Sequence, residues 1–123
     1  MIKGTINPKL EPIVELRLHN KNGETQLIEA TVDTGFNGYL TLPLSIIEGL
    51  DCTRLGLGRA ILADGSEGIF EIYEVVLEWD NQLKEVEVDI VNCNPLIGMA
   101  LLENYQLQIT VFVGGEVIIK PIL

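Results

Sequence analysis

Hydrophobic and polar residues alternate along much of the chain, which is the pattern of β-strands that pack one face on a core and expose the other. The first clear example is Pro12–His19. The pair Asn22-Gly23 follows it, and both residues tolerate the positive φ angles of a tight hairpin turn. The return strand is therefore predicted over Thr25–Val32.

The same pattern recurs in short segments as far as the C-terminus. Further strands are predicted over Tyr39–Leu42, Arg59–Ala63, Gly68–Glu78, Gln82–Val91, Leu107–Val113 and Val117–Ile122. Two very short helices are predicted, Leu44–Leu50 after Pro43, whose missing N–H suits a first turn, and Met99–Tyr105. About nine strands separated by close turn signals predict one all-β domain over residues 1–123, a barrel or a sandwich.

Composition and charge narrow the class of protein. The chain is 47% hydrophobic and 21% charged, which is typical of a globular domain that buries a core. Its apolar runs are too short to span a bilayer, and the first residues lack the apolar stretch of a secretory signal, so we expect a cytoplasmic protein. A net charge of −10 with scattered basic residues argues against nucleic acid and favours neutral or basic partners.

Few residues are available for metal or thiol chemistry. Cys52 and Cys93 form no Cys-x-x-Cys motif, so we expect two free, buried thiols, although spacing leaves a disulfide between them open. With His19 as the sole histidine and no EF-hand loop, no metal or cofactor is expected. Gly56-Leu57-Gly58 lacks a third glycine and a following helix, so it is predicted to be a turn rather than a phosphate loop.

Nucleophilic catalysis also lacks its residues, which leaves carboxylate chemistry. A Ser-His-Asp or Cys-His site would have to use His19, and no Gly-x-Ser-x-Gly signature is present. An apolar strand instead runs into Val32-Asp33-Thr34-Gly35. An acid at the end of a buried strand is costly unless it is hydrogen-bonded or paired, and Thr34 and the N–H groups near Gly35 could supply those bonds. The alternative is an Asp33 that only caps its own turn.

This segment resembles the catalytic loop of the retropepsin-like (clan AA) aspartic peptidases, the single-lobe relatives of pepsin and the retroviral proteases. In that family, hydrophobic residues precede Asp-Thr-Gly, and a flap hairpin and then a hydrophobic-hydrophobic-Gly motif with a short helix follow it. Here Asp64-Gly65 stands at the flap position and Leu96-Ile97-Gly98 leads into Met99. The resemblance covers most of the chain and implies a closed acid-protease-like β-barrel with a single lobe.

Two departures from the retroviral and pepsin pattern stand out. The run Asp33-Thr34-Gly35-Phe36, with Gly38 and Leu40-Thr41-Leu42-Pro43, is similar to a prokaryotic subgroup in which Phe follows the triplet. The retroviral and pepsin branches have Ala or Ser at that position, so Phe36 would change the floor or wall of the substrate groove. Many retroviral proteases also pair an acid after the triplet with an Arg after the later glycine. Asn37 and Met99 hold those positions here, so a subunit contact must be built differently.

The resemblance implies a role for each matching residue. Asp33 would be the catalytic carboxylate, with Thr34, Gly35, Phe36 and Gly38 supporting its loop; Ala63, Asp64 and Gly65 would form the flap over substrate; and Leu96, Ile97 and Gly98 would pack beneath the loop. Thr34 is expected to hydrogen-bond across or behind the loop, Gly35 to allow a close approach and Gly38 to let the chain turn away. For Asp64-Gly65 a plain hairpin turn is an equally weighted alternative.

One Asp-Thr-Gly in the chain implies a homodimer, because two carboxylates sharing a proton are needed to hydrolyse an amide without a metal. The expected function is therefore an aspartic endopeptidase that cleaves an extended polypeptide. Two alternatives stay open: a catalytically inactive dimerisation or peptide-binding module on this fold, and an acidic barrel that binds a partner protein through its edge strands. Either Met1–Ile6 or the C-terminal hairpin could provide the dimer sheet.

Overall fold

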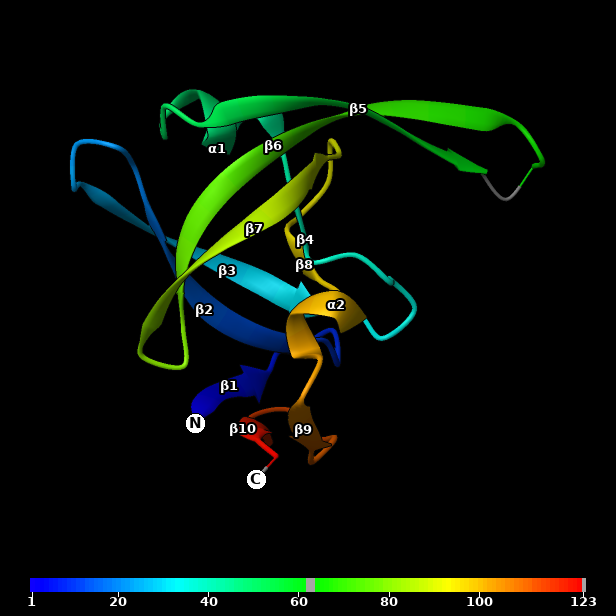
Figure 1. Ribbon diagram of the computed structural model, residues 1–123. Helices are drawn as coiled ribbons and strands as arrows, with labels where there is room; N and C mark the ends of the chain where they lie inside the picture. Colours follow the sequence, from blue (N-terminus) through cyan, green and yellow to red (C-terminus); the bar gives the residue numbers. More distant parts are fainter. Residues whose placement is uncertain (62–63, 123) are drawn as a thin grey trace.

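The computed structural model describes residues 1–61 and 64–122 and shows a chain built almost entirely of strands, with two short helices (Figure 1). The elements are β1 (Ile2–Ile6), β2 (Pro12–His19), β3 (Thr25–Val32), β4 (Leu40–Leu42), α1 (Leu44–Glu48), β5 (Thr53–Ile61), β6 (Glu67–Trp79), β7 (Gln82–Ile90), β8 (Leu96–Ile97), α2 (Met99–Leu102), β9 (Tyr105–Ile109) and β10 (Glu116–Pro121). The all-β prediction is confirmed. No helix within the described ranges is long and apolar enough to cross a membrane.

The strands form one sheet in the order β5-β6-β7-β4-β8-β3-β2-β1-β10-β9. An additional pairing joins β2 to β6, with Leu18 opposite Leu77 and His19 opposite Val76. The strands β2, β3, β8, β4, β7 and β6 are thereby linked in a ring. The ring encloses the core, and β5, β1, β10 and β9 extend from it.

Most of the core is made by the inward faces of the strands in the ring, and Ile6 of β1 with Val117 and Ile119 of β10 adds to it. Alternate residues of β2, β6 and β7 are buried, for example Leu18, Leu77 and Val88, all with no exposed surface. Leu101 on α2 closes the core at the end where β8 lies. Burial of each such side chain contributes about 2 kcal/mol, so the alternation read from the sequence is also the main source of stability.

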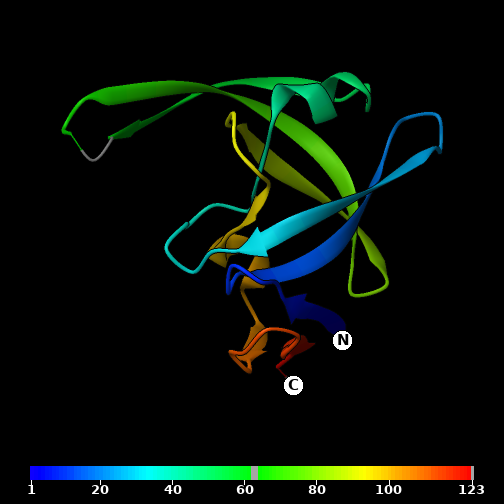
Figure 2. The same ribbon diagram turned by 180° about the vertical axis from the view of Figure 1, so that it is seen from behind.

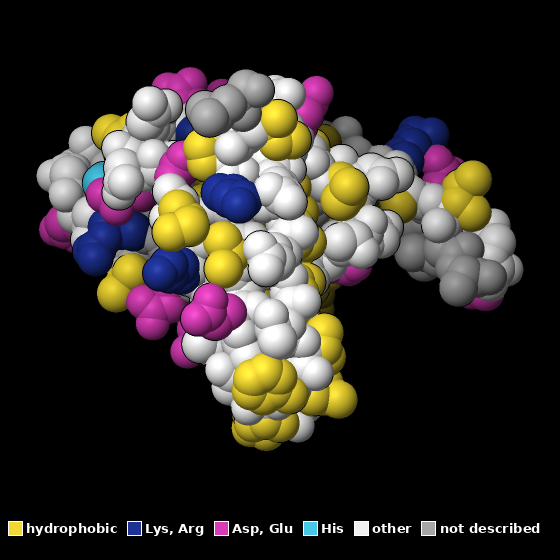
Figure 3. All heavy atoms as spheres, turned by 90° about the horizontal axis from the view of Figure 1, so that it is seen from below, with side chains coloured by type: hydrophobic (Ala, Val, Ile, Leu, Met, Phe, Trp, Pro, Cys, Tyr) yellow, Lys and Arg dark blue, Asp and Glu magenta, His cyan; other side chains and the backbone are white. Residues whose placement is uncertain are grey.

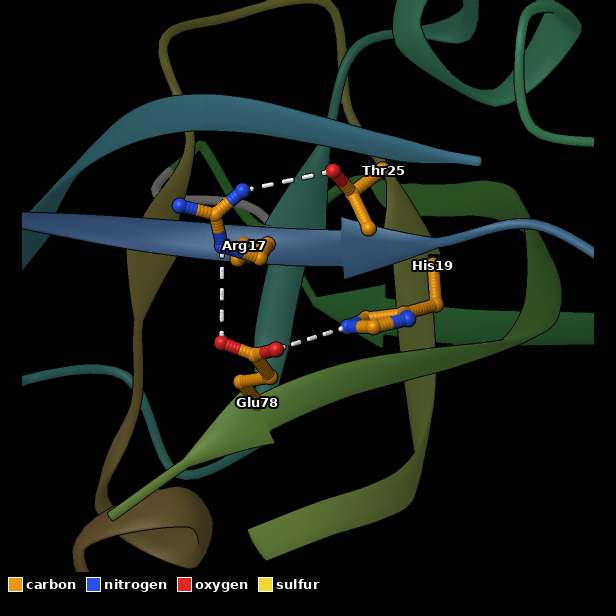
Figure 4. A network of polar contacts seen from close by, with 4 residues as sticks. All are labelled: Arg17, His19, Thr25 and Glu78. Carbon is orange, nitrogen blue, oxygen red and sulfur yellow. Dashed lines mark hydrogen bonds and ion pairs between the residues drawn. The ribbon is translucent and has the colours of Figure 1, made fainter. Parts of the chain in front are cut away.

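A polar network covers the outside of the β2–β6 junction (Figure 4). His19 Nε2 lies 3.1 Å from Glu78 Oε1, and Arg17 Nε lies 3.5 Å from Glu78 Oε2. Arg17 also donates from Nη1 to Thr25 Oγ1 over 3.3 Å, which ties β3 to the same cluster. Exposed ion pairs of this kind contribute little energy, so the short pairing of β2 with β6 depends mainly on the leucines beneath it.

The prediction of a turn at Gly56-Leu57-Gly58 is wrong, because these residues lie inside β5. β5 begins at Thr53, well before the predicted Arg59, and its register against β6 shifts between Arg54 and Gly56. A side chain at position 58 would collide with the ring of Phe70. Gly58 is therefore needed to make room for Phe70 on the neighbouring strand, which a local turn pattern cannot reveal.

The ends of several elements also differ from prediction. The segment Ile2–Ile6, which was not counted among the strands, is β1 and pairs with β10 on one side and β2 on the other. The second helix ends at Leu102, not Tyr105, because Asn104 adopts a left-handed φ of 69° that no α-helix continues through. Both cysteines are free, as expected, but Cys93 is exposed rather than buried and Cys52 is half-buried.

Candidate active site

Asp33 directly follows the last residue of β3 and is half-buried. The preceding Val32 is buried and pairs in parallel with Ile97 of β8. The Asp33 N–H continues this ladder by donating to the Ile97 carbonyl over 2.9 Å. The start of the loop is therefore fixed from behind by the strand that carries the hydrophobic-hydrophobic-Gly motif.

The Asp33 carboxylate is oriented by its own loop. The Gly35 N–H donates to Oδ1 over 2.9 Å, and the Phe36 N–H donates to the Asp33 carbonyl over 3.2 Å. A Cβ on residue 35 would lie 3.3 Å from the same Oδ1, so glycine permits the close approach. Thr34 is exposed, and among the described residues its hydroxyl has no hydrogen-bond partner, so the expected bond across or behind the loop is not made within one chain.

β8 is a two-residue strand inserted between β3 and β4. It runs parallel to β3 and antiparallel to β4, where Leu96 lies opposite Thr41. The Leu96 N–H donates to Thr41 Oγ1 over 3.0 Å, and the Thr31 N–H donates to the Pro95 carbonyl over 2.9 Å. Thr41 is 4% exposed, so its hydroxyl is a buried acceptor that holds β8 in place. The sequence did not predict this role, although a Thr between two hydrophobic leucines was a signal for a buried hydroxyl.

The far end of the loop is attached to α2. The Met99 N–H donates to the Phe36 carbonyl over 2.7 Å, and the Ala100 N–H donates to the Gly38 carbonyl over 3.1 Å. The Gly98 N–H donates to the Tyr39 carbonyl over 3.0 Å. These bonds use N–H groups that a helix start leaves without internal partners, so the loop and α2 satisfy each other.

Phe36 lies against the two glycines of this junction. Its ring lies 2.5 Å from where a Cβ on Gly38 would stand, and a Cβ on Gly98 would also meet the ring and the Gly38 carbonyl. Gly38 lies in the bend before β4, where the chain was expected to turn, although it does not adopt a positive φ. Its missing side chain makes room for Phe36, which is half-buried. Phe36 thus contacts the base of the loop.

The β5–β6 hairpin projects on the side of the molecule where loop 33–38 lies, as both views show (Figures 1 and 2). Ser66 donates to Asp64 Oδ1 from its N–H over 2.9 Å and from its hydroxyl over 2.5 Å. These bonds lower the pKa of Asp64, and Gly65 turns the chain with a φ of 85°. Ala63 lies outside the described residues.

A second carboxylate near the loop was missed by sequence reasoning. Asp89 lies on β7 opposite Thr41 of β4, and its Oδ2 is 3.5 Å from the Cβ position of Gly38. Burial, and then the nearby Glu87, raise the pKa of the half-buried Asp89. The alternating Glu85, Glu87 and Asp89 had predicted only a solvated face, and nothing local distinguishes the last of them.

Two cavities formed by described residues lie away from Asp33. One of about 190 Å³ is lined by His19, Cys52 and neighbours, and another of about 380 Å³ lies between the β1–β2 turn and Pro95. Burial and the adjacent Asp51 raise the pKa of Cys52, partly offset by Lys21, which disfavours a reactive thiolate. The described residues contain no group of three side chains placed to bind a metal.

The sequence matches no known family model and no curated protein. The site is therefore interpreted from its own geometry: an oriented, half-buried carboxylate on an open surface, with a rigid support behind it and a long hairpin on the same side.

Proposed function

We propose that the protein is an aspartic endopeptidase that acts as a homodimer, with Asp33 of each subunit at the two-fold axis. The observation that carries this is the setting of Asp33. Its main chain is bonded to β8, one carboxylate oxygen accepts from Gly35, and the side chain is only half-buried. An acid that only capped a turn would not need the inserted strand β8 behind it.

The arrangement of elements supports a closed, single-lobe acid-protease-like barrel as the finer description of the fold. The ring of strands carries the Asp-Thr-Gly loop on one side, β8 and α2 support it, and the β5–β6 hairpin projects over the same side. This is the order of parts that the resemblance implies, with Asp64 and Gly65 at the tip of the flap.

Catalysis would require the carboxylates of two subunits to share one proton, since like charges at close range do not both ionise. The ionised carboxylate takes a proton from water as its oxygen attacks the scissile carbonyl carbon, and the neutral one donates its proton to the carbonyl oxygen. In the tetrahedral intermediate the newly protonated carboxyl gives its proton to the nitrogen as the C–N bond breaks, and a hydroxyl of the intermediate gives its proton to the other carboxylate. A carboxylic acid and an amine leave, and the pair of carboxyl groups again shares one proton. No metal or cofactor enters these steps.

The second carboxylate would come from a second copy of the chain. The chain has one Asp-Thr-Gly, and the exposed Thr34 hydroxyl stands beside it where a partner loop could accept its hydrogen bond. Substrate would lie extended between Asp33 and the flap and bind by main-chain hydrogen bonds. The net charge of −10 would favour neutral or basic polypeptides, and two free thiols suit a reducing compartment such as the cytoplasm.

A peptide-binding dimer that does not cleave is the second candidate. The observation that favours it is Met99, which stands 46% exposed where many retroviral proteases place a pairing Arg. Without that ion pair the two loops would be held less rigidly, and peptide binding tolerates such looseness better than proton sharing does.

The decisive experiment compares Asp33→Asn with Asp51→Asn, an exposed acid in a positive-φ turn that Asn adopts readily. Cleavage of an unfolded polypeptide should vanish in the first variant and persist in the second, with both folded by circular dichroism. The wild-type rate should follow a bell-shaped curve on the acid side of neutrality. Cleavage that survives Asp33→Asn ends the peptidase proposal, and peptide binding without any cleavage selects the second candidate.

A further inference from the structure

β9 is the last strand of the sheet and pairs, among the described residues, with β10 alone. Backbone bonds fix which of its groups face outward. The Thr110 N–H donates to the Glu116 carbonyl over 3.0 Å, and the Ile122 N–H donates to the Asn104 carbonyl over 2.9 Å. Because antiparallel ladders alternate, the N–H groups of Leu107 and Ile109 point away from β10, toward a free edge.

This edge carries none of the usual protection against pairing. Edge strands are commonly blunted by Lys, Pro or inward-pointing charge. The eleven residues Tyr105–Gly115 contain no charged side chain and no proline, in a chain with a net charge of −10. Gln106 and Gln108 are the exposed polar residues of the strand itself. The edge is therefore free to add another strand.

The tip of the β9–β10 hairpin holds three hydrophobic residues in water. Val111, Phe112 and Val113 are 65%, 59% and 58% exposed. The tip is rigid, because the Gly114 N–H donates to the Ile6 carbonyl over 2.9 Å and the Ile6 N–H donates to Gly115 over 3.0 Å. Figure 3, which views the molecule from below, shows hydrophobic side chains on a projecting edge from which the acidic side chains are set back.

We infer that the β9 edge and the Val111–Val113 tip form the contact with a second copy of this chain. The inference rests on the proposed homodimer and identifies its surface. Two copies that each carry a charge of −10 repel one another wherever acidic faces meet, so an uncharged, apolar contact is the arrangement that electrostatics favours. Strand addition supplies hydrogen bonds for the outward N–H groups, and the tip supplies apolar burial.

The alternative dimer segment, Met1–Ile6, is already used within the chain. β1 pairs with β10 over the residues Ile2, Lys3, Gly4 and Thr5 and meets β2 at Thr5 and Ile6. Exchange of β1 between subunits would first break that ladder. Pairing through β9 breaks nothing.

The surface is also connected to the candidate catalytic loop. Only Glu103 and Asn104 separate α2 from β9, and the first N–H groups of α2 bond the carbonyls of Phe36 and Gly38. Figures 1 and 2 both show α2 between the loop after β3 and the β9–β10 hairpin. A dimer that forms through this edge therefore contacts an element that α2 connects to the candidate catalytic loop.

The test introduces one charge at the tip. Phe112→Glu should weaken the dimer, measured by sedimentation equilibrium, at least about tenfold, the effect of losing one well-buried aromatic contact. The control is Leu27→Glu, which makes the same charge change at a similarly exposed site, 55%, opposite Arg17 on β2. It should leave the dimer constant unchanged. A dimer unaffected by Phe112→Glu, or equally weakened by both variants, overturns the assigned surface.

A second variant isolates strand pairing. Ile109→Pro removes an outward N–H without removing a bond to β10, and proline is tolerated on edge strands in this orientation. The Ile109→Pro variant should unfold at a temperature similar to that of Ile109→Val, yet it should dimerise more weakly. Equal dimer constants for the two overturn the edge contact, and if the proline variant does not fold, Phe112→Glu decides.

Failure of the surface and failure of the peptidase proposal give different results. If the wild type dimerises and cleaves but Phe112→Glu remains dimeric, the surface is wrong and the peptidase stands. If Phe112→Glu becomes monomeric while cleavage survives Asp33→Asn, the surface stands and the peptidase is wrong. A wild type that stays monomeric at high concentration overturns both.

Discussion

The Met99 N–H donates to the Phe36 carbonyl over 2.7 Å, which connects the first turn of α2 to the loop that carries Asp33. Two positions that depart from the retroviral pattern are therefore in direct contact through their backbones. The Phe36 ring lies against Gly38 and Gly98 at the same junction. Local contacts within one chain thus hold this loop, although the Arg ion pair of the retroviral proteases that the sequence resembles is absent.

Replacement of Phe36 by Ala tests how far the ring supports the loop. The change should lower the free energy of unfolding by about 2 kcal/mol, less than for a fully buried Phe because the side chain is half-buried. Urea unfolding measures it, with Leu83→Ala, at a site 64% exposed and outside the proposed dimer contact, as the control expected to stay within about 0.5 kcal/mol. If the two variants have equal stability, the ring does not support the loop. Any cleavage activity should fall with the loss of stability at Phe36.

Gly98→Ala should be among the most destabilising single substitutions, at about 3 kcal/mol or more. The new Cβ would meet the Gly38 carbonyl and the Phe36 ring, and the backbone on one side of that contact is fixed by β8. Gly49→Ala is the matched control, since its nearest neighbour would be 3.7 Å away and its φ is −83°. Thermal unfolding compares the two. Similar melting temperatures would contradict the tight packing assigned to Gly98.

The sequence predicts the local parts of the fold and misses the parts made by contact between distant segments. Asn22-Gly23 and Asp64-Gly65 predict their hairpins because turn chemistry is encoded in adjacent residues. β8 has two residues, too few to show a period, and it exists because β3 and β4 pair with it on either side. Gly58 makes room for Phe70 on the neighbouring strand, so the glycine-rich local sequence wrongly predicted a turn.

The same division holds for the candidate site. Asp33 was identified because its motif is contiguous in sequence, and its position at the end of β3 followed from the apolar strand before it. Thr41 and Asp89 meet only through the parallel pairing of β4 with β7, across almost fifty positions of sequence. No periodicity indicates that pairing, so the contact between these two residues beside the loop could not be predicted.

Thr41→Val should destabilise the protein by about 1 to 3 kcal/mol, because the change leaves the Leu96 N–H without its acceptor in a buried position. Thr41→Ser keeps the hydroxyl and should recover most of that loss, apart from the missing methyl group. Native-state hydrogen exchange at Leu96 gives a local measurement, with faster exchange expected in the Val variant alone. If Ser and Val behave alike, the hydroxyl is not what holds β8.

Asp89 should make stability depend on pH. Burial and Glu87 raise its pKa in the folded state, so the folded protein binds a proton more tightly there than the unfolded chain does. The stabilisation from proton binding at Asp89 is therefore fully present below the pKa that Asp89 has in the unfolded chain. It is lost as pH rises through the pKa that Asp89 has in the folded protein. Asp89→Asn, which stays uncharged, should melt about 2 °C higher than wild type at pH 7, a small gain because Asp89 is partly exposed.

The matched control for that prediction is Glu85→Gln, four residues earlier on the same strand and exposed, where removal of one charge from an acidic chain tests general repulsion alone. The difference between Asp89→Asn and wild type should shrink as pH falls into the range where the carboxyl of Asp89 is protonated. Thermal unfolding from pH 7 down to pH 4 follows it. An equal gain for both variants, or a gain for Asp89→Asn that does not shrink in acid, would show that burial beside Gly38 has no specific effect.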